Sequence, residues 1–543
     1  MKWSSLLMIP EPFPHQVTAN NKLNPLQYAA LFADMGTGKT RIAIDWFIHK
    51  LNTIGSDRVV IIAPSVVGEQ WVDEQLPEHC GVHYKTHAFE AKSTQKALRK
   101  LDNFIMSAKY AEGLHILCIH FETFVGNKGQ DLIQQFLSTS NKAPIIIVDE
   151  SSRIKNPDAI SVKHIVALRH TYPNSFRMIM SGTPASKSPV DLWSQFDFLT
   201  QNYFNCGYVV FKAAHSVRID KKFKVKGRLM TREMTLDRDT YDSIKKIIAK
   251  NTFQGRLHEA VPAMVQKRFG IAAHDFEFVR NSPKFQRFRN MDKLQEKIAP
   301  VTYAVKLDDC ADIPKKIHRK IKLPLNPEQK RLIKDLIKYS ATVYDGEMLT
   351  IDIKALIGLR VLQICGGNFS HLTDLEGKFA TTPIKGVNYK MKYLMEDIPE
   401  IGDQQFIICA VYTPEVIEIN KQISRITDIG KLHGDTPKQE RTRVIREFKA
   451  GHLQGMVMNP SVGGYGLNLQ MARIQYWYSR NYKTEARLQA EARGRRITTV
   501  KSPIYKDLLS DISFEDNVLE VLQEGKDIND IFVNKAINEV FKL

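Results

Sequence analysis

The chain has 543 residues, of which 43% are hydrophobic and 25% charged, a composition typical of globular proteins and not of disordered or fibrous ones. It carries 77 Lys and Arg against 59 Asp and Glu, a formal net charge of +18, which favours a polyanionic partner such as nucleic acid. The absence of a bilayer-length apolar run, a poor signal sequence and 6 scattered cysteines argue against a membrane protein, a zinc site and a disulfide framework.

Up to about residue 200, short β-branched runs alternate with stretches of helical character. The runs at 58–64, 144–150 and 177–184 predict buried parallel strands that end in polar or glycine turns. The amphipathic segments between them are long enough for crossover helices. This pattern predicts an α/β doubly wound unit, in which ligands bind at the carboxyl ends of the strands.

The character of the sequence changes twice after residue 200. Between 201 and 398 strand signals become sparse and Lys-rich helical stretches dominate, with clustered cations at 218–232 and 313–322. After 399 the α/β pattern returns. We therefore expect two α/β lobes separated by a basic, helical middle, and the strand-like runs of the second lobe are 405–411, 455–460, 473–478 and 502–509.

A glycine-rich turn, "ADMGTGKT" at 33–40, follows the first apolar run. A full P-loop has the pattern GxxxxGK[ST], and here Ala33 occupies the position of its first glycine. The two glycines let backbone N–H groups face a phosphate, the lysine can reach the β- and γ-phosphates, and the final threonine can hold Mg²⁺. The residues expected to bind nucleotide are Met35, Gly36, Thr37, Gly38, Lys39 and Thr40.

An acidic pair, Asp149 and Glu150, ends the apolar run of 145–150. Asp149 would hold the Mg²⁺ of bound ATP, while Glu150 would orient and deprotonate the attacking water. The alternative is a strand that ends in soluble residues, as Asp-Glu pairs often do. The P-loop lysine lies 110 residues upstream in the same α/β block, which favours the nucleotide site.

The order of these segments resembles the Snf2 family of superfamily 2 DNA-dependent ATPases. The most distinctive fragment is "RIKN" at 153–156, directly after the acidic pair, and the resemblance continues nearly end to end. The other similar segments are "PFPHQ" (12–16), "VIIAPSVVGEQWVDE" (60–74), "CIHFETF" (118–124), "SGTPASKSPVDLWSQFDFL" (181–199), "LRVLQICGGNF" (359–369), "KLHGDTPKQERTRVIREFKAG" (431–451), "SVGGYGLNLQMA" (461–472) and "QAEARGRRI" (489–497).

This resemblance implies two RecA-like lobes, each a parallel sheet flanked by helices, with helical insertions between them. It implies ATP and Mg²⁺ as cofactors, double-stranded DNA held by its backbone as the partner, and a monomeric active species. The expected parts are an ATP-binding lobe at 1–200, a basic helical protrusion and interlobe linker at 201–323, a second helical insertion at 324–398, and a C-terminal lobe with a brace helix at 399–543.

The resemblance also implies roles for single residues. Gln16 would lie against the adenine, and Gly466 would also contact the nucleotide. Arg493 and Arg496 would act as arginine fingers on the γ-phosphate, and their spacing of three places them on one face of a helix. The expected DNA contacts are Ser65, Trp71, Thr123, Ser461, Gly463, Gly464, Asn468 and Tyr482.

Some positions depart from the family pattern. The family usually has His at Ser152, Asp at Ala492, Gly-Gln at Thr498-Thr499 and a cation at Ser461. The groups that hydrolyse ATP are retained, and the altered positions are those that couple the lobes or contact DNA. The lack of appended domains resembles bacterial or phage-encoded members, so we expect a location in the cytoplasm of a bacterium or phage-infected host.

Three functions are compatible with the sequence. The first is a motor that moves along double-stranded DNA and remodels it or displaces bound proteins. The second is a strand-separating or branch-migrating helicase, which needs a wedge, and no inserted β-hairpin with an aromatic tip is evident in the sequence. The third is a nucleic-acid-binding scaffold switched by ATP, which has no need for a water-activating Glu150.

Overall fold

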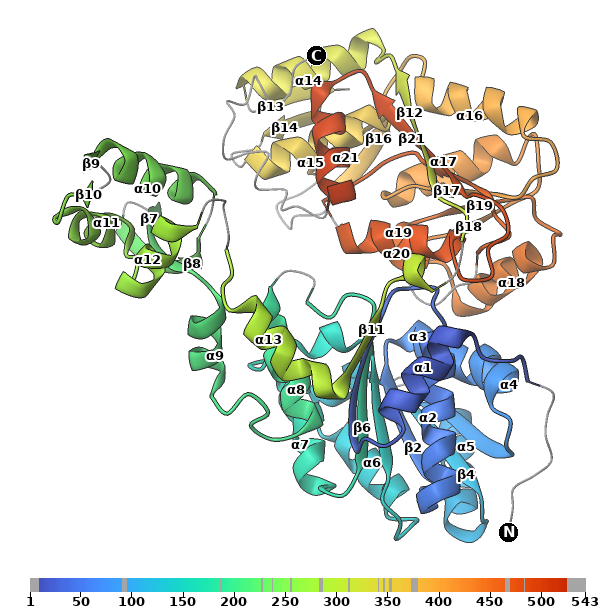
Figure 1. Cartoon of the computed structure of the whole chain (residues 1–543). Helices are drawn as coiled ribbons and strands as arrows, with labels where there is room; N and C mark the ends of the chain where they lie inside the picture. Colours follow the sequence, from blue (N-terminus) through green and yellow to red (C-terminus); the bar gives the residue numbers. More distant parts are fainter. Residues whose placement is uncertain are drawn as a thin grey trace. The chain divides into compact units, whose positions relative to one another are not determined.

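The computed structural model divides the chain into two compact units, Met1–Cys310 and Ala311–Leu543, which are described separately here (Figure 1). None of the helices it describes combines the length and apolar character needed to cross a membrane. The described residues are 9–89, 95–185, 188–225, 228–236, 238–253, 256–282, 287–310, 313–339, 341–344, 347–350, 354–372, 379–463, 469–482 and 484–524.

The first unit is built around a parallel sheet with the strand order β11-β1-β6-β5-β2-β4-β3. Its strands carry Val, Ile and Leu on both faces, because helices cover both sides of the sheet. This confirms the predicted α/β class. The strands are β1 (Tyr28–Ala33), β2 (Arg58–Ala63), β3 (Tyr84–Phe89), β4 (Leu114–His120), β5 (Ile145–Asp149), β6 (Phe176–Ser181) and β11 (Thr302–Val305).

Two cores form on the opposite faces of this sheet. Because side chains alternate along a strand, Val59 and Ile61 of β2 join one core while Val60 and Ile62 join the other. Trp46 of α2 fills the first core and Phe104, Phe136 and Phe196 fill the second. The helices are α1 (Pro14–Leu23), α2 (Lys39–Ile54), α3 (Ser65–Gln70), α4 (Leu76–His79), α5 (Gln95–Tyr110), α6 (Lys128–Leu137), α7 (Ile160–Thr171) and α8 (Leu192–Leu199).

An inserted module with its own hydrophobic core lies between α8 and β11 in the chain. The basic stretch 218–232, expected to be helical, instead forms the antiparallel hairpin of β7 (Arg218–Val225) and β8 (Arg228–Thr235). Short runs in which Ile, Phe and Val alternate with Lys suit a strand, and the lysine content concealed this period. The module's other elements are α10 (Arg238–Lys250), β9 (Thr252–Phe253), β10 (Arg256–Leu257), α11 (Val261–Phe269) and α12 (Ala273–Asn281) (Figure 1). The flanking helices α9 (Tyr208–His215) and α13 (Met291–Ile298) bury Phe211 and Leu294 in a core of the first sheet.

The expected segment 201–323 also supplies strands to both sheets. β11 pairs with β1, with Thr302 beside Ala30, whereas β12 (Ile317–Leu323) pairs with β21 of the second unit. The division between the units therefore falls at Cys310 and Ala311, inside that expected segment.

The second unit has a parallel sheet with the order β12-β21-β20-β17-β19-β18. As in the first unit, separate cores cover its two faces. This confirms the second predicted α/β lobe. Its other elements are α16 (Tyr389–Glu400), β17 (Phe406–Cys409), α17 (Thr413–Ile423), β18 (Ile429–Leu432), α18 (Lys438–Lys449), β19 (Gly455–Met458), α19 (Pro460–Gly463), β20 (Ile474–Trp477), α20 (Thr484–Gly494) and β21 (Ile504–Ser510).

The last of the described helices, α21 (Ser513–Glu524), packs within the second unit. Phe514, Val518 and Leu522 share a core with α14 (Pro327–Tyr339) and α15 (Lys354–Cys365). The predicted helix at 513–532 is thus present up to Glu524, and 525–532 lie outside the described residues. The segment 324–398, expected as a second helical insertion, also contains two hairpins. They are formed by β13 (Ala341–Tyr344) with β14 (Glu347–Thr350) and by β15 (Asn368–Leu372) with β16 (Phe379–Pro383).

Candidate active site

The phosphate loop connects β1 to α2. Gly36 and Gly38 adopt φ values of 85° and 81°, a left-handed conformation that favours glycine. A Cβ on Gly38 would lie 2.2 Å from Nε2 of Gln16, so a larger residue there would displace the Gln16 amide. The loop therefore presents backbone at the N-terminus of α2, where an anion is favoured by unpaired N–H groups and the helix dipole.

Lys39 is the first residue of α2, and its side chain extends back over the loop. Its Nζ donates to the carbonyl oxygens of Ala33 (2.7 Å) and Asp34 (3.1 Å). A Cβ on Gly182, in the turn after β6, would lie 3.4 Å from the same Nζ. The lysine thus lies between the ends of β1 and β6, which are neighbouring strands.

His15 and Gln16 of α1 hold this loop from the other side. His15 Nε2 and Gln16 Nε2 both contact the carbonyl oxygen of Thr37, at 2.8 Å and 3.2 Å. The N–H of Phe13 donates to Gln16 Oε1 at 2.9 Å. The Gln16 side chain therefore contacts the phosphate loop from α1, and its expected contact with adenine stays a prediction.

Asp149 ends β5, two strands from β1 in the sheet. Its carboxylate accepts from the indole N–H of Trp71 (2.9 Å) and from the backbone N–H of Glu150 (2.8 Å). Burial raises the pKa of Asp149, while the Trp71 hydrogen bond and the nearby charge of Lys39 lower it. A buried carboxylate close to the phosphate loop suits a site for Mg²⁺ bound to a nucleotide.

Trp71 and Thr123 do not lie where the DNA-contact expectation put them. Trp71 is 1% exposed and orients Asp149, so its ring offers no surface to DNA. Thr123 is 4% exposed, and its hydroxyl donates to the carbonyl oxygen of His120 at 2.6 Å. Both positions match the family motif, but their side chains face inward; Ser65, the first residue of α3, is exposed.

Glu150 has φ of 55° and ψ of 53°, a conformation that residues other than glycine seldom adopt. It precedes a short 3-10 helix, η3 (Ser151–Ile154). Such strained residues concentrate at functional sites. With this conformation at Glu150, the backbone leaves the direction of β5 immediately after Asp149 and enters η3.

The expected DNA contacts of the second unit are partly described. Ser461 is exposed in α19, at the carboxyl end of β19, and lines a pocket with Arg480 and Arg487. Gly463 ends α19, and Gly464, Gly466 and Asn468 lie outside the described residues. Tyr482 is half-buried against the core of α14, α15 and α21, and burial raises its pKa.

Arg493 and Arg496 do not share a helix face, which corrects the expectation from their spacing. α20 ends at Gly494, where a Cβ would lie 2.2 Å from Nε2 of Gln475. Arg496 lies beyond the helix, in a turn where its N–H donates to Thr499 Oγ1 at 2.8 Å. Arg493 is in the last helical turn and is 8% exposed.

Comparison with known proteins adds to these observations. A family described as the SNF2-related domain matches residues 26–355, and one described as the helicase conserved C-terminal domain matches 389–498. The chain belongs to the SNF2-related family. This confirms the resemblance inferred from the sequence motifs.

Two relatives of this SNF2-related chain are longer than it is. The chain is 23% identical over 513 residues to YwqA of Bacillus subtilis (strain 168), whose name proposes an ATP-dependent helicase/translocase, with 92% of this chain and 46% of that protein covered. It is 24% identical over 534 residues to the SWI/SNF chromatin-remodeling complex subunit snf22 of Schizosaccharomyces pombe, with 94% and 27% covered. It thus spans about half or less of these relatives.

A solved structure is also similar. The match to the Sulfolobus solfataricus SWI2/SNF2 ATPase core in complex with dsDNA covers 100% of this chain and 100% of that chain. The sequence identity is 18% and the TM-score is 0.36.

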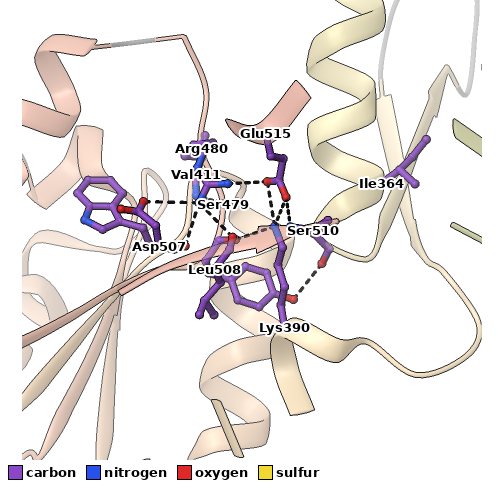
Figure 2. A network of polar contacts seen from close by, with 12 residues as sticks. Ile364, Lys390, Val411, Ser479, Arg480, Asp507, Leu508, Ser510 and Glu515 are labelled. Atoms are coloured by element: carbon purple, nitrogen blue, oxygen red, sulfur yellow. Dashed lines mark hydrogen bonds and ion pairs between the residues drawn. The ribbon is translucent and has the colours of Figure 1, made fainter. Parts of the chain in front are cut away.

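The SNF2-related chain contains a buried ionic network that the sequence did not predict. In Figure 2, Lys390 and Arg480 converge on the carboxylate of Glu515, at 3.0 Å and 2.7 Å. Although burial alone raises it, Lys390 and Arg480 hold the pKa of Glu515 below its usual range. This network fixes α21 to the strand ends of the second sheet.

A neighbouring part of the network holds the helix that carries Arg493. Arg487 of α20 forms two hydrogen bonds with Asp507, at 2.7 Å and 2.9 Å, and a third with Glu491 at 2.9 Å. All three side chains are nearly fully buried. Removing one partner of such a group leaves an uncompensated buried charge, so the position of α20 depends on the complete set.

Proposed function

We propose that this protein is an ATP-hydrolysing motor that binds and moves along double-stranded DNA. The observation that carries the proposal is the meeting of two loops at one edge of the first sheet. Lys39 follows β1, Asp149 ends β5 and Glu150 comes directly after it, and the charge of Lys39 lowers the pKa of Asp149. Because all strands are parallel, these groups gather at the carboxyl edge.

The residues present fit a nucleoside triphosphate. Gly36 and Gly38 have positive φ and no Cβ, a conformation that lets backbone N–H groups face a phosphate, and Lys39 supplies a cation. Thr40 and Asp149 would hold Mg²⁺, which when bound neutralises phosphate charge. The residues expected to touch nucleotide are Gln16, Met35, Gly36, Thr37, Gly38, Lys39, Thr40 and Gly466.

The proposed reaction is hydrolysis of the terminal phosphoanhydride. The oxygen of a water molecule forms a bond to the γ-phosphorus, the bond from that phosphorus to the bridging oxygen breaks, and ADP and phosphate leave. Glu150 orients the water and accepts its proton. Arg493 and Arg496 would stabilise the charge that develops on the γ-phosphate.

Double-stranded DNA is the proposed partner because the chain is strongly basic. Residues 217–290 of the inserted module hold eighteen Lys and Arg against eight Asp and Glu, more than half of the net charge of +18. Lys246, Lys250 and Lys267 are among its exposed cations. Contacts of this kind bind phosphates without reading the base sequence.

A triplex-displacement assay tests movement along a duplex. With ATP, the protein should release a third strand bound ahead of it on the duplex, and Lys39→Ala should not. Loss of the third strand at the same rate without ATP, or no release at all, would contradict a duplex-tracking motor.

A strand-separating helicase is the second candidate, because the structure contains the inserted hairpin that the sequence did not reveal. β7 and β8 pair antiparallel, from Arg218 opposite Thr235 to Val225 opposite Arg228. A helicase that parts two strands needs a wedge, and an inserted hairpin is one form that a wedge can take. A strand-displacement assay beside the triplex assay separates the candidates, since only a helicase releases a strand of the duplex. An ATP-switched scaffold would release neither.

A further inference from the structure

Gln195 of α8 joins three segments around the candidate site. It is fully buried, at 0% exposed, and its Oε1 accepts from the hydroxyl of Ser151 at 2.7 Å. Its Nε2 donates to the carbonyl oxygens of Pro184 (2.7 Å) and Asp191 (2.8 Å). These partners fix the orientation of the amide, because the two carbonyl oxygens can only accept hydrogen bonds and must face the NH₂ group of Gln195.

One of these segments adjoins the phosphate loop. Pro184 lies in the turn after β6, two residues beyond Gly182. A Cβ on Gly182 would lie 3.2 Å from Cγ of Met35 and 3.4 Å from Nζ of Lys39. The turn that Gln195 holds therefore packs closely against the phosphate loop and its lysine, so a displacement of either would displace the turn.

Another of these segments carries the proposed general base. Ser151 is fully buried, directly follows Glu150 and begins η3. Glu150 is in the left-handed region, so its own backbone does not favour the observed direction. The hydrogen bond from Ser151 to Gln195 is a contact that can keep this turn, and the Glu150 side chain with it, in place.

We propose that Gln195 and Ser151 are positioning residues that couple the turn at Gly182–Pro184 to the orientation of Glu150. The inference rests on the proposed ATP hydrolysis and adds the route by which the phosphate side of the site sets the base. Neither residue needs to touch the nucleotide. Their effect is on the geometry of the attacking water, where a displacement of about 1 Å costs about 100-fold in rate.

The test is steady-state ATPase kinetics of Ser151→Ala, Gln195→Met and the double variant. Gln195→Met keeps the side-chain volume and removes all three hydrogen bonds, whereas Ser151→Ala removes one and creates little space. Ser194→Ala is the control, because Ser194 is buried on the same helix and its hydroxyl has no hydrogen-bond partner among the described residues. ATP affinity of each protein is measured separately by titration.

Both single variants should lose about tenfold or more in kcat, with ATP affinity within about twofold of wild type. The double variant should lose no more than the larger single effect, since one route is broken in each case. Ser194→Ala should behave as wild type.

Wild-type kcat in Ser151→Ala and Gln195→Met would overturn the inference, and so would lost ATP affinity at unchanged kcat, or losses that add in the double variant. If Gln195→Met does not fold, Ser151→Ala alone decides. A wild-type protein that hydrolyses no ATP would refute the proposed function instead.

Discussion

Glu415 of α17 should make the second unit less stable as the pH rises toward 8. The side chain is 1% exposed, and the hydroxyl of Ser479 donates to its carboxyl group. Burial raises the pKa of Glu415 to about 8 from an ordinary value of 4.5, although the Ser479 hydrogen bond and the Lys390 cation lower it. The folded protein therefore holds this proton more tightly than the unfolded chain does.

The sign and size of the effect follow from this difference. Stability from the retained proton is complete below pH 4.5 and is lost as the pH rises through 8. Each pH unit between these values costs about 1.4 kcal/mol, so the loss between pH 4.5 and 7 is about 3 kcal/mol. The contributions of Asp507 and Glu515, whose pKa values are lowered, have the opposite sign and are lost in more acidic solution.

Glu415→Gln mimics the protonated side chain and should remove this dependence. Urea unfolding at pH 5, 6, 7 and 8 should show the variant gaining on wild type by about 1 kcal/mol or more per pH unit above pH 5. The exposed Glu396→Gln on α16 is the control and should follow wild type. A constant difference between Glu415→Gln and wild type across this range would refute the reasoning.

Four further outcomes are expected. Glu150→Gln should abolish ATP turnover and leave nucleotide binding nearly intact in a titration, because it removes the base and not the phosphate contacts. Arg493→Ala and Arg496→Ala should each reduce turnover by about 10³ or more at saturating ATP and duplex DNA, with DNA affinity retained and little rescue by Lys. Trp71→Phe should cost about 1–3 kcal/mol in urea unfolding, because the buried carboxylate of Asp149 loses a hydrogen bond. DNA affinity should fall steeply with salt and show little sequence preference, and a flat plot of log K against log salt would contradict phosphate contacts.

The strands predicted from the sequence are buried on both faces: β2, β5, β6, β17, β19, β20 and β21. Such strands appear in the sequence as unbroken β-branched runs, as in β2 and β5. β12, which is mostly exposed and lies in the basic stretch 313–322, was not predicted. The β7–β8 hairpin was missed because four of the eight residues of β7 are Lys or Arg, which leaves too few apolar residues to show the period of a strand. A Lys-rich segment gives the same composition whether it forms a strand or a helix.

Motif matching located the site but did not give the direction of each side chain. Trp71 and Thr123 occupy motif positions, yet both are buried and hold other parts of the first unit. Arg496 was expected on a helix face because a spacing of three suggests one, but α20 ends at Gly494, two residues before Arg496.

The buried ionic network could not be predicted from the sequence for a different reason. Lys390 and Glu515 are 125 residues apart, and Arg487 and Asp507 are 20 apart. No periodicity links residues on different elements, so their pairing follows only from the packing of strands and helices. The roles of the nucleotide and DNA residues stay predictions until they are tested.

ATP turnover measured with no nucleic acid, single-stranded DNA, duplex DNA and duplex RNA tests the central claim most directly. The account predicts the highest rate with duplex DNA, and loss of that rate in Glu150→Gln. Equal rates under all four conditions, or a rate that survives in Glu150→Gln, would contradict a DNA-dependent ATPase built on this site.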